Sequence, residues 1–204
     1  MKKILVAVPT LNKVDVKFVA SWANIVFCNG IEGVECHPQF VVDSMTYTAR
    51  INLADIAVKG GFDYVFWMDS DMIIPADALK KMLDADKDMV TGLYFQRRGD
   101  HAPVIYSGVD ENGRIVYEDY PRFNLFPIAA CGFGCVLMKT DVIRKVAGAY
   151  NGATFQPFTG IGEDLSFCYR WRRSGGEIWC DPTIQCGHIG EYVFTEADYE
   201  TSGV

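Results

Sequence analysis

Four short apolar runs in the first half of the chain have the length and composition of strands buried on both faces of a sheet. They are Lys3–Val8, Gln39–Val42, Tyr64–Met68 and Met89–Leu93. The segments between them carry apolar residues at helical spacing, which predicts three helices. These are Val14–Cys28, Met45–Val58 and a shorter helix that Pro75 opens and that reaches about Asp84. Strands that alternate with helices in this way predict a mostly parallel sheet flanked by helices.

The second half of the chain has a different pattern. Val104–Ser107 and Arg114–Tyr120 are strand-like and flank turn-forming residues 110–113, which predicts an antiparallel hairpin. The remaining expected elements are a strand (Cys135–Lys139), a helix capped by Thr140 and reaching about Val146, a helix (Glu163–Arg173) and a last strand (Ile178–Asp181). The fold expected is one α/β domain over residues 1–204, with a Rossmann-type sheet and a small antiparallel element in its middle.

Composition excludes several classes of protein. The chain has 204 residues, half of them hydrophobic and 22% charged, so it can bury a core and is not disordered over most of its length. The formal net charge of −7 argues against a broad basic face for duplex nucleic acid. No apolar run reaches the roughly 20 residues that cross a bilayer, so we expect no transmembrane segment. The seven cysteines are odd in number and form no C-x-x-C pair, which favours reduced thiols in a cytoplasmic protein.

The strongest chemical feature is Asp69-Ser70-Asp71, which follows the very apolar run Tyr64–Met68. In open α/β sheets, ligands bind at the carboxyl ends of the strands. Two carboxylates one residue apart repel each other unless a cation or a proton lies between them. Hard oxygen ligands of this kind suit Mg²⁺ or Mn²⁺, which in turn bind phosphate oxygens. The alternative is a surface turn ahead of Pro75, because D-x-D is a frequent tripeptide.

Two further features carry candidate chemistry. Glu163 and Asp164 begin a predicted helix, where the helix dipole favours negative charge; they are either simple N-terminal caps or a general base that faces a cleft. His188 follows the last predicted strand between Gly187 and Gly190, and an imidazole nitrogen with two Asp oxygens makes a sensible Mn²⁺ shell, although a lone histidine is more often structural. The short basic cluster at 97–98 is expected to be solvated.

Together and in this order, these features resemble the GT-A-type glycosyltransferases, particularly the family-2-like group. The resemblance covers Lys3 to Gly190. It implies a nucleotide pocket formed by seven residues: Pro9, Thr10, Asn12, Asp43, Arg50, Asp69 and Ser70. It also implies that Gly132, Phe133 and Gly134 pass under the donor sugar and belong to the donor-sugar and acceptor site. The implied ligands of a Mn²⁺ or Mg²⁺ ion are Asp69, Asp71 and His188, and the implied catalytic pair is Asp164 and Glu163.

The function implied by this resemblance is transfer of a sugar from a nucleotide-diphosphate sugar, expected to be UDP-linked, to an acceptor hydroxyl (EC 2.4 class). Residues 1–95 would bind the nucleotide, residues 96–190 would form the acceptor side, and residues 191–204 would be a tail that is mobile or folds over a site. A cation on Asp71 would stabilise the departing diphosphate. Asp164 would take the acceptor's proton if the anomeric centre is inverted. The acceptor stays open among a glycan, a lipid-linked sugar, a protein side chain and a modified nucleobase, and a homo-oligomer is possible.

Two other functions are consistent with parts of the sequence. Residues 69–73 resemble the D-x-D-x-[TV] motif of haloacid-dehalogenase-type phosphatases, but they follow the third predicted strand rather than the first, and residue 73 is Ile. A non-catalytic nucleotide-sugar-binding protein is the other alternative. The presence of all the expected catalytic carboxylates argues against it.

Overall fold

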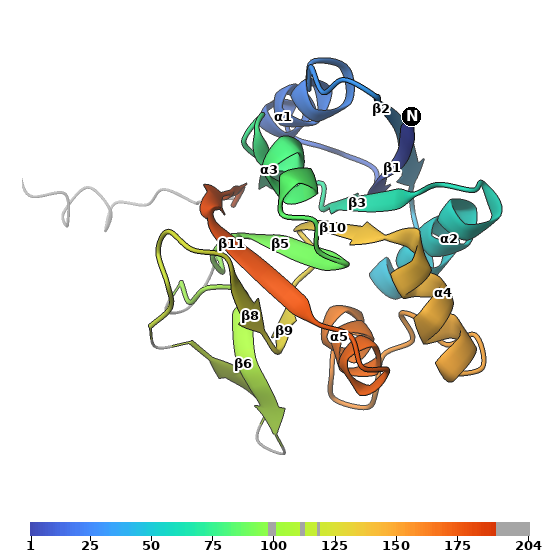
Figure 1. The fold of residues 1–204 in the computed structure, drawn as a ribbon, viewed down its shortest axis with the longest axis vertical. Helices are drawn as coiled ribbons and strands as arrows, with labels where there is room; N and C mark the ends of the chain where they lie inside the picture. The colour runs from blue at the N-terminus through green and yellow to red at the C-terminus, as the bar shows by residue number, and fades with distance from the viewer. Residues whose placement is uncertain (98–100, 111–112, 118, 191–204) are drawn as a thin grey trace, which may run out of the picture.

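The computed structural model describes residues 1–97, 101–110, 113–117 and 119–190, and its centre is a seven-stranded sheet in the order β2-β1-β3-β10-β5-β11-β8 (Figure 1). The strands are β1 (Lys2–Pro9), β2 (Val34–Val41), β3 (Tyr64–Met68), β5 (Met89–Leu93), β8 (Phe126–Ile128), β10 (Cys135–Lys139) and β11 (Ile178–Gln185). All run in one direction except β8 and β10. The predicted α/β fold with a mostly parallel sheet is therefore confirmed.

Helices cover both faces of this sheet (Figure 1). The first face packs against α1 (Val16–Phe27) and α3 (Ala78–Asp84), and the second against α2 (Thr46–Lys59), α4 (Thr140–Ala149) and α5 (Glu163–Arg173). Successive side chains of a strand point to opposite faces. In β1, Ile4, Val6 and Val8 accordingly join the α1–α3 core, whereas Leu5 and Ala7 join the other. Burial on both faces explains why β1 is a continuous apolar run.

Two small sheets complete the fold. β6 (Ile105–Asp110) pairs with β7 (Gly113–Val116) and with β9 (Ala130–Cys131), all antiparallel, which confirms the predicted hairpin; residues 111–112 of its turn and the tail 191–204 lie outside the described residues. β4 (Met72–Ile73) pairs with β12 (Gly187–His188), with His188 opposite Met72. This short pairing places His188 beside the turn that holds Asp71.

Several boundaries differ from those predicted, because pairing between distant strands overrides the local pattern. β2 begins at Val34 rather than Gln39, since it pairs with β1 along its whole length. β11 continues past Asp181 to Gln185 through a register shift. Thr140 is not the cap of α4: the N-cap is Lys139, and the Thr140 hydroxyl is buried without a partner. In the described part of the chain, no helix combines the length and apolarity needed to span a bilayer.

Candidate active site

The site lies where the carboxyl ends of β1, β3 and β5 meet at one edge of the sheet. Strand β10 runs the opposite way, so its amino end reaches this edge, and Cys135 pairs with Met68. The loop before β10 therefore lies beside the end of β3, where the Asp69 N–H donates to the Gly134 carbonyl at 3.2 Å. This is the position at which open α/β sheets bind ligands.

A pocket of about 250 Å³ opens at this edge. Its outer end is formed by the segments that follow β1 and β2, namely Pro9, Thr10, Leu11, Ser44 and Thr46. Asp69, Ser70 and Asp71 line its middle, below the end of β3. The part that we call the inner end is lined by Arg50 from α2, Tyr94 after β5, Phe133 before β10, and Glu163 and Asp164 at the start of α5. One pocket thus contains both pairs of acidic residues that the sequence singled out.

Not all of the predicted nucleotide-binding residues lie in this pocket. Asn12 and Asp43 are exposed and do not line it, whereas their neighbours Leu11 and Ser44 do. Asp43 has a positive φ of 52°, which belongs to the turn between β2 and α2. Pro9 and Thr10 line the pocket as predicted, whereas Leu11 and Ser44 were not predicted.

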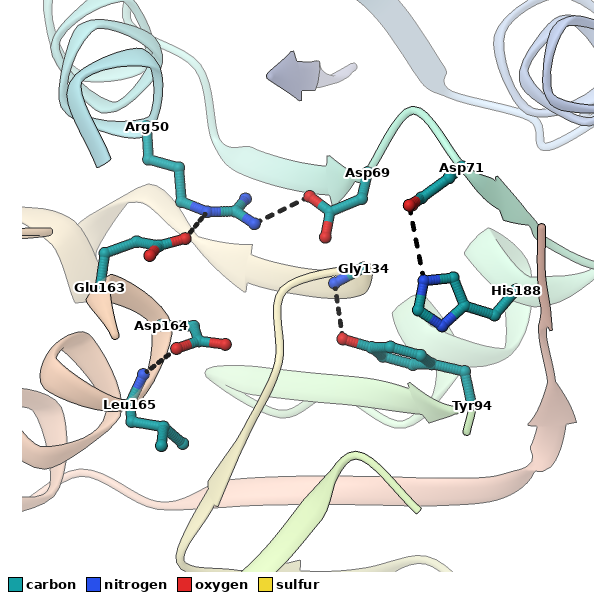
Figure 2. A network of polar contacts seen from close by, with 9 residues as sticks. All are labelled: Arg50, Asp69, Asp71, Tyr94, Gly134, Glu163, Asp164, Leu165 and His188. Carbon is teal, nitrogen blue, oxygen red and sulfur yellow. Dashed lines mark hydrogen bonds and ion pairs between the residues drawn. The ribbon is translucent and has the colours of Figure 1, made fainter. Parts of the chain in front are cut away.

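Arg50 is a buried residue that joins the two acidic pairs. Its side chain is nearly fully buried, and its Nη2 donates to Asp69 Oδ1 at 2.8 Å while its Nε donates to Glu163 Oε1 at 3.3 Å (Figure 2). Its guanidinium also lies 5.3 Å from the centre of the Phe133 ring. Arg50 thus forms a clamp between the end of β3 and the start of α5, and it lines the pocket in which the resemblance places it.

Replacing Arg50 by alanine is expected to destabilise the fold by about 3 kcal/mol, because it leaves two partly buried carboxylates without their counter-charge. The measurement is urea denaturation at pH 7.5. The control is Arg144→Ala, which breaks the exposed ion pair between Arg144 and Asp141, 2.6 Å apart, and should cost less than about 1 kcal/mol. Equal effects of the two substitutions would contradict the clamp.

Asp71 is held by a different set of partners. Its Oδ2 lies 3.0 Å from Arg97 Nη1 and 3.5 Å from His188 Nε2 (Figure 2 draws the contact with His188). Burial tends to raise the pKa of Asp71, but the hydrogen bond to His188 and the charges of His188 and Arg97 outweigh it, so the pKa is lowered. The same hydrogen bond raises the pKa of His188. Arg97 was expected to be solvated, but it is a direct partner of Asp71.

The predicted metal ligands are brought together only in part. In the described ranges, no three His, Cys, Asp or Glu side chains surround a common cation position, since Asp69 contacts Arg50 instead. Asp71 and His188 nevertheless fit a metal in chemistry and orientation. The His188 Nδ1 lies 2.8 Å from the Phe95 carbonyl, which can only accept a hydrogen bond. Nδ1 therefore carries the proton, and in the neutral ring Nε2 presents its lone pair beside Asp71.

Asp164 lies at the inner end, and one of its two oxygens accepts no hydrogen bond from a described residue. Its Oδ1 accepts the Leu165 N–H at 2.7 Å. Burial, followed by the charge of Glu163, raises the pKa of Asp164 to about 6. A carboxyl whose pKa lies near neutrality is suited to accept a proton during a reaction. This environment favours the general-base interpretation of the Glu163-Asp164 pair over simple capping, and α5 has Gly162 as its N-cap.

Tyr94 is a pocket residue that sequence reasoning missed. Its hydroxyl accepts the Gly134 N–H at 3.2 Å, and its ring meets the His188 ring edge-on (Figure 2). A side chain at Gly132 would overlap the Tyr94 hydroxyl, which explains why glycine is required there. The available signal was its place directly after a predicted strand, at the edge where ligands bind.

No protein-family model matches the chain, and no curated protein matches it in sequence. Among solved structures, A197 from STIV matches with a TM-score of 0.57 and 14% identity, over 96% of this chain and 97% of that chain. GalNAc-T7, solved with UDP, GalNAc and Mn²⁺, matches with a TM-score of 0.60 and 11% identity, over 94% of this chain but 43% of that chain. At these identities the likeness shows the fold, which is GT-A-like.

Proposed function

We propose that the chain is a metal-dependent glycosyltransferase that uses a nucleoside-diphosphate sugar, with UDP as the nucleotide, and an acceptor hydroxyl. The observation that carries this proposal is the single pocket that Asp69–Asp71 and Glu163–Asp164 line from opposite sides. A GT-A-like fold and the UDP and Mn²⁺ present in the GalNAc-T7 structure support the donor class and the metal. The outer end of the pocket, formed by the loops after β1 and β2, would take the nucleoside.

The middle of the pocket would hold the diphosphate. Asp71 and His188 would hold a Mn²⁺ or Mg²⁺ ion, which as a Lewis acid stabilises negative charge on a leaving diphosphate. Arg97, whose Nη1 lies 3.0 Å from Asp71, supplies a further positive charge at the same place. Its guanidinium suits phosphate oxygens, because it offers several N–H donors in one plane.

The inner end would carry out proton transfer. In an inverting reaction, ionised Asp164 accepts the proton of the acceptor hydroxyl as that oxygen attacks the anomeric carbon. Glu163 is anchored by Arg50, which also anchors Asp69, so the two sides of the pocket keep a fixed spacing. Arg50 is thus a positioning residue rather than a ligand of the donor.

The test is release of nucleoside diphosphate from UDP-, GDP- and dTDP-linked sugars, with Mn²⁺ or with EDTA and in the presence of simple saccharide acceptors. We expect turnover of a UDP-sugar with Mn²⁺ and its loss in EDTA. Release of inorganic phosphate from p-nitrophenyl phosphate, with Asp69 phosphorylated, would support the phosphatase instead. The ion pair between Arg50 and Asp69, 2.8 Å long, disfavours Asp69 as that nucleophile. Binding of UDP without turnover of any donor would indicate a non-catalytic binding protein.

A further inference from the structure

The inner end of the pocket carries an excess of negative charge. Glu163 and Asp164 line it and Asp69 lies beside it, and among the described residues Arg50 is the one cation that lines the pocket with these three carboxylates. Arg50 already contacts two of these carboxylates, at 2.8 and 3.3 Å. The excess shows in the titration of Asp164, whose raised pKa of about 6 reflects burial first and then the neighbouring charge of Glu163. An anionic group on a ligand would be repelled here by these carboxylates, because the charges are only partly screened by water.

These carboxylates are also hydrogen-bond acceptors with unused capacity. Each ionised carboxylate has about four acceptor positions. The protein hydrogen bonds on Asp69 and Glu163 come from Arg50, and Asp164 accepts from the Leu165 N–H, so each retains free positions toward the pocket. Such an end suits a ligand that donates several hydrogen bonds and has no charge. A neutral sugar ring with several hydroxyls has this chemistry.

Tyr94 adds one hydrogen-bond donor to this acceptor-rich end. Its side chain is 5% exposed, and its hydroxyl is anchored because it accepts the Gly134 N–H at 3.2 Å. No described residue accepts the hydroxyl's own proton. The phenol therefore offers a hydrogen-bond donor whose oxygen is held in place by Gly134.

We propose that the inner end of this pocket is a subsite for an uncharged, polyhydroxylated sugar, and that Tyr94 determines specificity there by donating its phenolic proton to a sugar oxygen. This inference rests on the proposed function and names the class of donor that it would use. It disfavours donors with a carboxylated sugar, such as a uronate, because the three carboxylates repel them and the charge of Arg50 is already shared by Asp69 and Glu163.

The charge selection is tested by calorimetric titration of the intact chain with Mn²⁺ and two matched pairs of ligands. These are UDP-glucose with UDP-glucuronate and UDP-galactose with UDP-galacturonate, which differ only in a hydroxymethyl or carboxylate group. We expect the neutral member of the better-bound pair to bind at least about tenfold more tightly than its uronate. In Glu163→Gln, which removes one negative charge, the ratio should fall several-fold. A uronate that binds as tightly as its neutral partner would overturn the subsite.

The role of Tyr94 is tested by comparing UDP with the neutral UDP-sugar that binds best. In Tyr94→Phe, the affinity for the UDP-sugar should fall about tenfold while the affinity for UDP stays unchanged, because the lost hydrogen bond involves the sugar alone. The control is Tyr120→Phe, whose ring stacks on Phe126 outside the pocket and which should change neither. Equal weakening of both ligands would indicate a structural role, and no change in either would also overturn the proposal. If the unmodified chain does not bind UDP at all, the proposed function itself fails.

Discussion

Replacement of Asp71 by asparagine is expected to lower kcat/KM for the preferred UDP-sugar at least about 1,000-fold while the chain remains folded. Asparagine keeps the size of the side chain but removes the charge that faces Arg97 and His188. The side chain is one-third exposed, so the substitution does not open a cavity in the core. Without that charge, the site would bind a divalent cation weakly, and the diphosphate would then lose the cation that stabilises it.

The assay for this prediction is release of UDP at saturating Mn²⁺, with a thermal unfolding curve to show that the variant is folded. Asp77→Asn is the matched control, because Asp77 pairs with Lys81 on the exposed face of α3 and lies outside the pocket. The control should retain the activity of the unmodified chain. An Asp71→Asn variant with activity within tenfold of the control would remove the cation from the proposed reaction.

Replacement of Asp164 by asparagine is expected to lower kcat about 100- to 10,000-fold, since it removes the group that accepts the proton. The same substitution should stabilise the fold. The folded chain raises the pKa of Asp164 to about 6, so it disfavours the anion. The free-energy cost of ionising Asp164 in the folded chain is fully present above about pH 6. It disappears well below about pH 4, which is the pKa of this aspartate in the unfolded chain. Asparagine avoids this free-energy cost, with an expected gain of about 2 to 3 kcal/mol at pH 8 and less than about 0.5 kcal/mol at pH 4.

Urea denaturation at the two pH values and a pH profile of kcat/KM measure these effects together. In the unmodified chain, kcat/KM should rise as Asp164 ionises, with a midpoint at about pH 6. The matched control is Glu177→Gln, an exposed carboxylate after α5 that should alter neither activity nor its pH profile. Loss of activity together with loss of stability at pH 8 would show that Asp164 is structural rather than a proton acceptor.

The parts of this site that the sequence predicts are those fixed by local pattern. A continuous apolar run that ends in Asp69-Ser70-Asp71 predicts a buried strand with a ligand-binding site at its end. A strand buried on both faces, as β3 is, has apolar residues at consecutive positions, so the sequence alone reveals it. Glu163 and Asp164 are likewise predicted at a helix start, and α5 begins at Glu163. The alternation of strands and helices also predicts the mostly parallel sheet flanked by helices.

The parts that the sequence does not predict depend on contacts between distant residues. The family resemblance places Arg50 in the pocket but does not predict its contacts with Asp69 and Glu163, which lie 19 and 113 residues away along the chain. His188 reaches Asp71 through a strand pair of two residues, too short to leave a periodic pattern. Asp69 also contacts Arg50, which residue type alone does not indicate.

The most direct test of the proposed site is calorimetric titration of the purified chain with UDP, once with Mn²⁺ and once with EDTA, and again with Asp71→Asn in Mn²⁺. A pocket that binds a nucleoside diphosphate through a cation on Asp71 should give saturable binding of one UDP per chain in Mn²⁺. EDTA and the substitution should each weaken that binding at least about tenfold, the equivalent of losing one strong ionic contact. The proposed site would be contradicted if UDP bound equally well under all three conditions, or under none of them.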